Sequence, residues 1–375
     1  MSGERPFSLL AMQLTHLSLS NYRNIEHSRV DFGSRFNLFH GSNGQGKTNF
    51  LEAIFFLGTV KSFRHARQAE IISWGKQAAT LSCAVIDDTM RHDLAITIEA
   101  HGKQLAVDGK SSARLVDYCS VLSVVAFSPE ELVMVNGSPD QRRRYLDRAI
   151  FSGDAGYLRL YHDYYRVLKQ RNQLLRSRSY HAMDAWSEQL VETAVRLIMA
   201  RDRYVAELAE LFTGFYSLIS GSDEVGRLCY HAHALEGRRE PDDVREGMVL
   251  ALARNSSAEK ERCTTLVGPH RDDLVFLLNG KPIRQHGSQG QQKSFVLAMK
   301  MAEIEYLTRT QGTQPVLLLD DMTAELDSSR ISHLLDYLVR KQMQVFITTT
   351  DPATVPLPDT IACSAFRVTA GRLQQ

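Results

Sequence analysis

The sequence predicts an α/β protein whose first lobe is formed by both ends of the chain, with a mainly helical second lobe inserted between them. Three observations support this fold class. A glycine-rich loop at 40–50 follows an apolar run and opens a helical pattern. Two short apolar runs, 315–321 and 344–351, enclose another helical pattern. Residues 140–255 have helical apolar spacing almost throughout. Helices between apolar strands predict a parallel sheet.

Length and composition are those of an ordinary globular chain. It has 375 residues, 43% hydrophobic and 23% charged, which is enough apolar material for a substantial core. The formal net charge is +1, so we expect an anionic partner to meet a local basic patch and not the whole molecule. The sequence contains no run of 18 apolar residues, so no membrane span is expected.

The cysteines and the N-terminus favour a cytoplasmic protein. Five cysteines, an odd number without a CxxC pair, predict neither a disulfide framework nor a zinc site. Residues 1–11 lack the apolar core of a signal peptide, and we expect them to be a disordered N-terminal extension. The cysteines are Cys83, Cys119, Cys229, Cys263 and Cys363.

The change in pattern along the chain sets the expected domain boundaries. Residues 12–135 are expected to form the N-terminal part of the first lobe, and residues 136–260 the helical lobe. Residues 261–375 return to the first lobe and complete it. The helical insertion is too short and too interrupted for an extended coiled-coil arm.

The N-terminal part begins with alternating polar and apolar residues, which predict strands at 14–24 and 28–40. A helix is expected at 48–59, directly after the glycine-rich loop. Further strand-like runs follow, and the last of them ends at a Ser-Pro pair. These runs are 79–87, 92–102, 103–108 and 121–128.

The remaining elements follow from the same patterns. Long amphipathic helices are expected at 157–178 and 185–219. Asn279-Gly280 predicts a hairpin turn between two strand-like runs. Helices are then expected at 288–310 and 328–341, on either side of the apolar run at 315–321.

The glycine-rich loop fits the pattern GxxxxGK[ST]. Its glycines let backbone N–H groups converge on phosphate oxygens at the start of a helix. Lys47 is expected to reach the β- and γ-phosphates and to take part in catalysis, and Thr48 to hold Mg²⁺. The candidate nucleotide-binding residues are Gly41, Ser42, Asn43, Gly44, Gln45, Gly46, Lys47, Thr48 and Asn49.

A second acidic motif lies at the end of an apolar run near the C-terminus. Residues 316–319 are apolar and are followed by Asp320 and Asp321. An acid at the end of a buried strand can hold Mg²⁺ as a Walker B carboxylate does, so Asp320 is the second candidate metal ligand. The plainer alternative is an ordinary strand followed by a polar turn.

Ser288, Gly290 and Gln291 stand at the start of an expected helix. A serine, a glycine and helix N-terminal amides suit a γ-phosphate, so these residues are also candidates for nucleotide binding. The alternative is an N-capped helix without a ligand.

A basic segment at 141–178 holds ten Arg or Lys residues against three acids. Such a stripe in a nearly neutral protein predicts contact with phosphates, with little sequence specificity. The alternatives are a solvated helix face and arginines that pack the insertion. The candidate DNA-binding residues are Arg142, Arg143, Arg144 and Arg171.

Three further features leave two interpretations open. Arg23 either approaches the nucleotide or DNA, or stabilises a turn. His270, Arg271 and Asp272 in GPHRDDL either line the nucleotide site or an interface between two copies of the chain, or form a buried salt-bridged turn. Tyrosines spaced along the helix that starts at Tyr157 are expected to belong to the core and not to stack on bases.

The order of these motifs resembles an ABC-type P-loop ATPase head, with SQGQ as signature, LLLDD as Walker B and Glu325-Leu326-Asp327 as D-loop. More specifically, NYRN, HGSNGQGKTN, FSPEEL, SPDQRRRYLDR, GPHRDDL and GSQGQQK resemble the RecF family of bacterial DNA-repair and replication ATPases. This resemblance extends from Met12 to the C-terminus.

The resemblance implies binding of ATP with Mg²⁺ and an ATP-dependent homodimer in which the signature serine of one subunit contacts the ATP of the other. It also implies binding to double-stranded and gapped DNA, and cooperation with RecR and RecO in placing RecA. Asp321 stands where this class usually has a catalytic glutamate, so a weak DNA-dependent ATPase is expected. An ABC transporter subunit and a P-loop metabolic kinase remain as alternatives.

Overall fold

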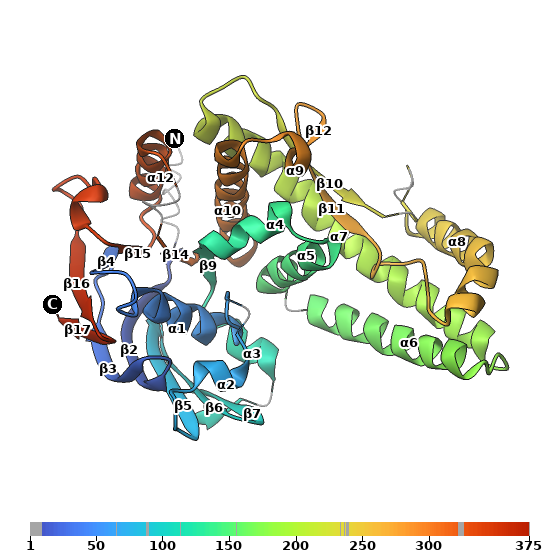
Figure 1. The fold of residues 1–375 in the computed structure, drawn as a ribbon, viewed down its shortest axis with the longest axis horizontal. Coiled ribbons are helices and arrows are strands. Elements are labelled where there is room, and N and C mark those ends of the chain that lie inside the picture. Colours follow the sequence, from blue (N-terminus) through green and yellow to red (C-terminus); the bar gives the residue numbers. More distant parts are fainter. Residues whose placement is uncertain are drawn as a thin grey trace, which may run out of the picture. The chain divides into compact units, whose positions relative to one another are not determined.

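The computed structural model describes residues 10–64, 66–87, 90–112, 114–154, 156–232, 234–235, 237, 240–321 and 326–374. The chain divides into two compact units (Figure 1). The first contains Met1–Leu132, Leu218–Gly221 and Lys293–Gln375, and the second contains Val133–Ser217 and Ser222–Gln292.

Two of the expected boundaries differ from this division. Residues 261–292, expected in the nucleotide-binding lobe, group with the helical unit because β11 (Asp273–Leu278) pairs with β10 (Gly226–His231). Residues 1–9 of the expected disordered extension lie outside the described residues. Leu10–Ala11, expected to be disordered with them, form β1, which pairs in parallel with β13 (Thr313–Gln314).

The first unit contains a six-stranded sheet in which β16, β4, β15, β14 and β9 run parallel and β17 is antiparallel to β16. All residues of β9, β14 and β15 are buried, as their continuous apolar runs predicted. The carboxyl ends of the parallel strands therefore share one edge. In spatial order the strands are β17 (Arg372–Gln374), β16 (Cys363–Thr369), β4 (Phe36–His40), β15 (Val345–Thr349), β14 (Val316–Leu319) and β9 (Val124–Phe127).

A second six-stranded sheet in this unit is antiparallel, with alternating buried and outward residues. Its strands, in spatial order, are β3 (Ile25–Asp31), β2 (Gln13–Tyr22), β5 (Ala78–Ile86), β6 (Arg91–Glu99), β7 (Gly102–Val107) and β8 (Lys110–Ser111).

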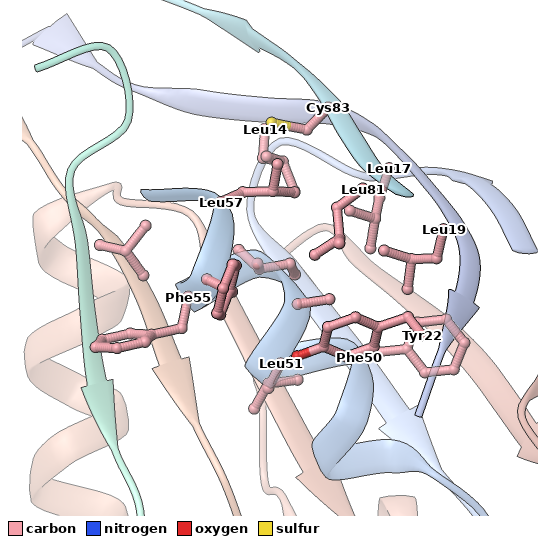
Figure 2. Packing of buried hydrophobic residues seen from close by; sticks show 14 of the residues in the cluster. Leu14, Leu17, Leu19, Tyr22, Phe50, Leu51, Phe55, Leu57, Leu81 and Cys83 are labelled. Carbon is pink, nitrogen blue, oxygen red and sulfur yellow. The ribbon is translucent and has the colours of Figure 1, made fainter. Parts of the chain in front are cut away.

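Helix α1 (Lys47–Thr59) lies between the two sheets and contacts β9 and β15 of one and β2 and β5 of the other. It is apolar on nearly every side, which is why it is buried on all faces. Figure 2 shows its side chains meeting those of the antiparallel sheet. The labelled residues are Phe50, Leu51, Phe55 and Leu57 of α1 and Leu14, Leu17, Leu19, Tyr22, Leu81 and Cys83 of the sheet.

The other helical elements of this unit are mostly short. They are α2 (Gln68–Ile71), α3 (Leu115–Cys119), the 3-10 turns Pro129–Leu132 and Pro352–Thr354, and α12 (Ser328–Lys341). Helix α10 (Gln289–Gln311) begins in the second unit and continues into the first.

The second unit is mainly helical, as predicted. A three-stranded sheet of β10, β11 and β12 (Lys281–Pro282) accompanies the helices. Asn279 and Gly280 join β11 to β12 with positive φ angles of 49° and 78°, which confirms the predicted hairpin turn. The helices are α4 (Val133–Asn136), α5 (Pro139–Gly153), α6 (Tyr157–Ser177), α7 (Met183–Ser220), α8 (Pro241–Arg262) and α9 (Ile283–His286).

The tyrosines of α6 pack in the interior of this unit. Tyr157 and Tyr164 are 1% and 0% exposed, so they belong to the core, as expected. Among the helices that the structure describes, none is both long and apolar enough to cross a membrane.

Candidate nucleotide-binding site

The glycine-rich loop connects β4 to α1 at the carboxyl edge of the parallel sheet. Gly41 and Gly46 have φ angles of 143° and 105°. A Cβ at Gly41 would stand 2.6 Å from the Val368 carbonyl oxygen, and one at Gly46 2.7 Å from Asn24 Oδ1. Conformation and space therefore both require glycine at these two positions. Gly46 is also the N-cap of α1, so the amides of the first helical turn are not covered by a capping side chain.

The side chain of Lys47 folds back into the loop. Its Nζ donates hydrogen bonds to the carbonyl oxygens of Gly41 at 2.6 Å and Ser42 at 3.0 Å. Burial lowers the pKa of Lys47, while the nearby carboxylates of Asp321 and Asp320 act in the opposite direction. The loop thus presents a fixed cation beside the helix N-terminus, a combination suited to a phosphate.

Asp320 follows β14, and its side chain connects the glycine-rich loop to β15 by hydrogen bonds. Its Oδ1 accepts a hydrogen bond from Thr48 Oγ1 at 2.9 Å and another from Thr348 Oγ1 at 2.7 Å. Asp320 is 5% exposed, and this burial raises the pKa of its carboxyl to about 6. The two hydroxyl donors oppose that shift, and the charges of Glu130 and Asp321 add to it.

Asp321 lies directly beyond Asp320 with a positive φ of 51°. Its backbone N–H donates to Thr348 Oγ1 at 2.8 Å, so Thr348 positions both acids. Glu325 of the expected D-loop lies outside the described residues. Asp327 is described as the N-cap of α12, where its side chain accepts a hydrogen bond from the Arg330 amide at 3.0 Å.

The loop is held from outside by residues that the sequence did not single out. The carbonyl oxygen of Gln45 accepts from the Gly371 amide at 2.8 Å, and its side-chain oxygen accepts from the Ala370 amide at 2.7 Å. Asn24 Nδ2 donates to the same Gln45 carbonyl at 3.3 Å, and Asn49 Nδ2 donates to Asn24 Oδ1 at 2.8 Å. Because these partners are distant in sequence, no local pattern could have revealed them.

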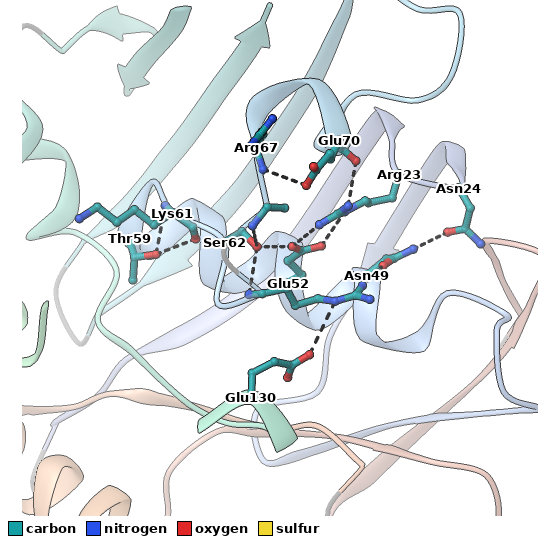
Figure 3. Close-up of polar contacts among 12 residues, drawn as sticks. Arg23, Asn24, Asn49, Glu52, Thr59, Lys61, Ser62, Arg67, Glu70 and Glu130 are labelled. Atoms are coloured by element: carbon teal, nitrogen blue, oxygen red, sulfur yellow. Dashed lines mark hydrogen bonds and ion pairs between the residues drawn. The ribbon is translucent and has the colours of Figure 1, made fainter. Parts of the chain in front are cut away.

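Glu52, in the middle of α1, holds the side chain of Arg23, which favours a structural role for Arg23 over contact with the nucleotide or DNA. Figure 3 shows its guanidinium group facing Glu52 of α1. Arg23 Nε and Nη2 donate to the two carboxylate oxygens of Glu52 at 2.9 and 2.7 Å, and Nη1 donates to the Glu70 carbonyl at 2.8 Å. Glu52 is fully buried, so this pair is structural.

Glu130 is an acid of this edge that the sequence analysis missed. It follows β9, which pairs with β14, and the Asp320 amide donates to the Phe127 carbonyl at 2.9 Å. Glu130 Oε1 is 3.9 Å from Arg64 Nε, and Arg64 Nη1 donates to Asn49 Oδ1 at 3.2 Å. The signal available in the sequence was the position of FSPEEL at the end of a buried parallel strand.

Ser288 and Gln291 form a capping box in the second unit. The Gln291 amide donates to Ser288 Oγ at 3.2 Å, and the Ser288 amide donates to Gln291 Oε1 at 2.7 Å. Gln291 Nε2 also donates to Glu224 Oε1 at 2.5 Å. Within one chain these residues therefore cap the N-terminus of a helix, as in the alternative interpretation of an N-capped helix without a ligand. Gly290 belongs to the same helical start.

Two of the expected DNA-binding arginines are buried, which corrects their assignment. Arg142 is 8% exposed and makes a two-pronged ion pair with Asp273 at 2.7 and 2.6 Å. Arg171 is 5% exposed and donates to Glu259 Oε2 at 2.7 Å. Their guanidinium groups are enclosed within the unit and are not accessible to DNA.

The other two arginines of this set differ from each other. The Arg143 side chain is 14% exposed and donates to the Asp272 carbonyl at 2.6 Å. The Arg144 side chain is 72% exposed and pairs with Asp140 at 2.6 Å. Only Arg144 of the four expected DNA contacts is therefore largely open to solvent.

The GPHRDDL segment forms a buried turn in the second unit. His270 Nε2 lies 3.1 Å from the Thr265 carbonyl, so it carries the proton, and Nδ1 accepts from the Tyr164 hydroxyl at 2.6 Å. Burial lowers the pKa of His270 to about 4. Tyr230 donates to Asp272 Oδ2 at 2.5 Å, which completes a packed polar network.

The donor set fits a magnesium ion that is shared with phosphate. Thr48 and Asp320 supply hydroxyl and carboxylate oxygens on adjacent elements, which is the ligand chemistry that Mg²⁺ prefers. Among the described residues there is no cluster of three or more His, Cys, Asp or Glu side chains able to hold a metal ion. A hard cation here would thus need phosphate oxygens or water to complete its shell.

A glycine-rich loop between β4 and α1, with an acid that follows another parallel strand of the same sheet against its threonine, defines a P-loop ATPase head. The family model RecF/RecN/SMC N terminal domain matches residues 13–368. The chain belongs to the RecF family of DNA replication and repair proteins.

The family assignment rests on near full-length similarity. The chain is 47% identical to the DNA replication and repair protein RecF of Geobacter sp. (strain M21), over 96% of this chain and 100% of that protein. It is 48% identical to the protein of the same name from Geobacter metallireducens, over 96% and 99% of the two chains.

Solved structures agree with this assignment. A structure of the recombination mediator protein RecF with ATP, in the RecFOR pathway, is 29% identical with a TM-score of 0.89 and covers 97% of this chain and 99% of that one. The Smc head domain of Pyrococcus furiosus, at 15% identity and a TM-score of 0.55 over 97% and 95% of the chains, shares the fold. The transporter alternative is not favoured by these relatives.

Proposed function

We propose that this chain is an ATP-dependent switch on DNA. It binds ATP with Mg²⁺, forms a homodimer that holds double-stranded DNA near gaps, and helps RecR and RecO to load RecA in the cytoplasm. The observation that carries the proposal is the pair of hydrogen bonds that Thr48 and Thr348 donate to Asp320. They hold the glycine-rich loop against the acid. The solved RecF–ATP structure, similar over nearly both whole chains, supports ATP as the nucleotide.

The residues of the first unit divide the work of binding. The first-turn amides of α1 and the Lys47 ammonium receive the β- and γ-phosphates, while Thr48 and Asp320 hold the magnesium ion. Magnesium, when bound, neutralises developing charge on the phosphates. Lys47 must exchange its bonds to Gly41 and Ser42 for phosphate oxygens, and these two bonds keep the cation in place beside the loop.

Asp321 is the proposed general base for slow hydrolysis. Its side chain is one methylene shorter than glutamate, and its backbone is fixed by the bond to Thr348. The carboxylate is therefore farther from the attacking water than that of a glutamate would be, and we expect slow hydrolysis. Slow hydrolysis suits a protein that times the release of DNA more than one that turns over continuously. Asp321→Asn should retain ATP binding and lose most hydrolysis; unchanged turnover would refute the assignment.

The dimer is proposed to complete each nucleotide site. Ser288, Gly290 and Gln291 of one copy would contact the γ-phosphate held by the other copy. A ligand that binds only the dimer stabilises it by about 2.7 kcal/mol at a hundredfold excess over its dissociation constant. Ser288→Arg should abolish ATP-induced dimers in sedimentation while nucleotide binding to the monomer persists.

The experiment that tests the whole proposal measures ATPase rate and light scattering with and without duplex DNA. We expect ATP to double the scattering mass and duplex DNA to raise the ATPase rate. An ATPase rate that duplex DNA does not change, together with no ATP-induced change in mass, would overturn the proposal and favour the transporter alternative.

A further inference from the structure

Four cations of α6 form a solvent-facing stripe. The side chains of Arg159 and Arg166 are 91% and 72% exposed, and Lys169 and Arg176 are also exposed. Successive separations of seven, three and seven residues keep the four on one side of a helix. We call this set, Arg159, Arg166, Lys169 and Arg176, the α6 stripe.

The opposite side of α6 is fixed to its own unit. Tyr157 donates to Asp147 at 2.5 Å, Tyr164 bonds to His270, and Arg171 donates to Ser187 Oγ of α7 at 3.0 Å. Figure 1 shows α6 as one continuous helix. Because the buried side is anchored along its length, the stripe is held outward without needing a ligand to order it.

The sign of charge separates α6 from the other long helices of this unit. Its only acid is Asp163, whose side chain is 37% exposed and lies 3.0 Å from Arg166 and 4.0 Å from Arg159. The exposed charges of α7 and α8, in contrast, are of both signs. They are Asp184, Glu188, Arg196, Arg203, Glu207 and Glu210 on α7 and Asp242, Asp243, Glu246, Arg254, Lys260, Glu261 and Arg262 on α8.

This contrast argues against an ordinary solvated helix face, where charges of opposite sign usually alternate. Exposed Gln170 and Gln173 lie within the α6 stripe and add neutral hydrogen-bond donors. The stripe is about 25 Å long at 1.5 Å per residue. Duplex DNA carries one negative charge per about 1.7 Å of its axis, so this length would meet many phosphates.

We propose that the α6 stripe is the surface that contacts the phosphate backbone of double-stranded DNA. This inference rests on the proposed function and names the residues that serve it. It replaces the buried Arg142 and Arg171 with four exposed cations from the same basic segment. Arginine, lysine and glutamine side chains on one rigid helix favour phosphate contact, so binding should be nearly independent of base sequence.

The test compares two variants of the full chain that lose the same net charge. The stripe variant is Arg159→Gln, Arg166→Gln, Lys169→Gln and Arg176→Gln. The control variant is Arg196→Gln, Arg203→Gln, Arg254→Gln and Arg262→Gln, at exposed positions of α7 and α8. Glutamine is a good helix former, so both variants should keep their helical circular dichroism and their affinity for a fluorescent ATP analogue.

Dissociation constants are measured with ATP and Mg²⁺ on two duplexes of unrelated sequence, across a range of salt concentrations. Each phosphate contact contributes about 0.9 to the slope of log K against log salt, so the stripe variant should lose about three to four units of slope. Its affinity at 0.1 M salt should fall by about a hundredfold on both duplexes, while the control stays within about threefold of the unchanged protein.

The inference would be overturned if the stripe variant and the wild-type protein had equal slopes of log K against log salt. It would also be overturned if the stripe and control variants lost equal amounts of affinity for DNA. Failure of the unchanged protein to bind any duplex would instead remove the proposed function, and the inference with it. Should the fourfold variant not fold, the pairs Arg159→Gln with Arg166→Gln and Lys169→Gln with Arg176→Gln should each lose about two units of slope.

Discussion

The hydroxyl of Thr48 donates a hydrogen bond to Oδ1 of Asp320 at 2.9 Å, although 272 positions separate the two residues. The contact exists because β4, β15 and β14 are neighbours in one parallel sheet, so the residues after β4 and β14 emerge at the same edge. Thr348 of the strand between them donates to the same oxygen at 2.7 Å. Hydrogen bonds therefore connect the glycine-rich loop, Asp320 and β15 to one another.

Replacing Thr348 with valine should weaken the magnesium-dependent part of ATP binding. The change removes a donor to the Asp320 carboxylate and the acceptor for the Asp321 amide. A hydrogen bond to a charged group contributes about 1.5–3 kcal/mol, so we expect roughly a tenfold loss of affinity with Mg²⁺ and little change without it. Titration of a fluorescent ATP analogue with and without Mg²⁺ measures the difference.

Thr349→Val is the matched control. Thr349 is the next residue of the same strand and is fully buried, but its hydroxyl bonds to the Asp351 carbonyl. An equal effect of the two substitutions would contradict a specific role for Thr348.

The raised pKa of Asp320 predicts that this carboxyl destabilises the nucleotide-free protein near neutral pH. Its folded pKa of about 6 exceeds the ordinary value of 3.8, so the folded state binds the proton more tightly. The stabilisation that the folded state gains from protonation of Asp320 is complete below about pH 4 and is lost as pH rises through 6. Asp320→Asn should therefore raise the free energy of unfolding at pH 7.5 by roughly 2–3 kcal/mol and have little effect at pH 4.

Urea unfolding of both proteins from pH 4 to pH 8 checks this pH dependence. The same titration should weaken Mg²⁺-dependent ATP binding below pH 6, because a protonated carboxyl cannot hold the metal ion. A constant difference in stability between the two proteins at all pH values would rule out titration of Asp320 as its source.

Arg23→Ala should lower the free energy of unfolding by about 3–5 kcal/mol, because it leaves the buried Glu52 carboxylate without its main partner. Replacing both members, as Arg23→Met with Glu52→Met, should recover much of that loss. Urea unfolding of the single and double variants measures the coupling. Strictly additive losses would show that the two residues act independently.

The His270 turn predicts acid sensitivity of the second unit. Its folded pKa of about 4 lies below the ordinary value of 6.5, so the folded state disfavours the added proton. Stability is therefore present above pH 6.5 and is lost as pH falls towards 4. His270→Gln should remove roughly 3 kcal/mol of this pH dependence.

Tryptophan fluorescence can report this unit separately. The two tryptophans, Trp74 and Trp186, lie one in each unit, so Trp74→Phe leaves a single reporter in α7. Unfolding of that protein with and without His270→Gln, between pH 4 and pH 7, gives the comparison. Identical acid transitions would exclude His270 as the titrating group.

Two arginines of α5, Arg142 and Arg144, should differ in how much they contribute to stability. Arg142→Ala should lower the free energy of unfolding by about 3–5 kcal/mol because it leaves Asp273 unpaired. Arg144→Ala, at an exposed pair with Asp140, should change it by less than about 1 kcal/mol. Chemical unfolding of both variants distinguishes the two roles, and similar losses would contradict the assignment.

Much of the fold and of the first unit's site could be predicted from local patterns. Continuous apolar runs identified the buried strands β9, β14 and β15, and the Asn279-Gly280 pair identified the hairpin. The loop 41–48 and the acids after β14 were evident because phosphate chemistry demands particular residue types at fixed local spacing. The order of these motifs was sufficient to suggest the family that the comparisons then confirmed.

Other features depended on partners that no local pattern can supply. The boundary at 261–292 moved because β11 pairs with β10. Thr348 and Glu130 entered the site only because their strands flank β14.

Sequence alone specifies the composition of the basic segment, but it does not specify which of the cations in this segment face solvent. Arg142 and Arg166 look alike in the sequence, yet one pairs with Asp273 in the interior and the other is 72% exposed. That difference arises from which side of each helix packs against the rest of the unit. Burial of a charge is decided by tertiary contacts, because only a specific partner offsets the cost of removing it from water.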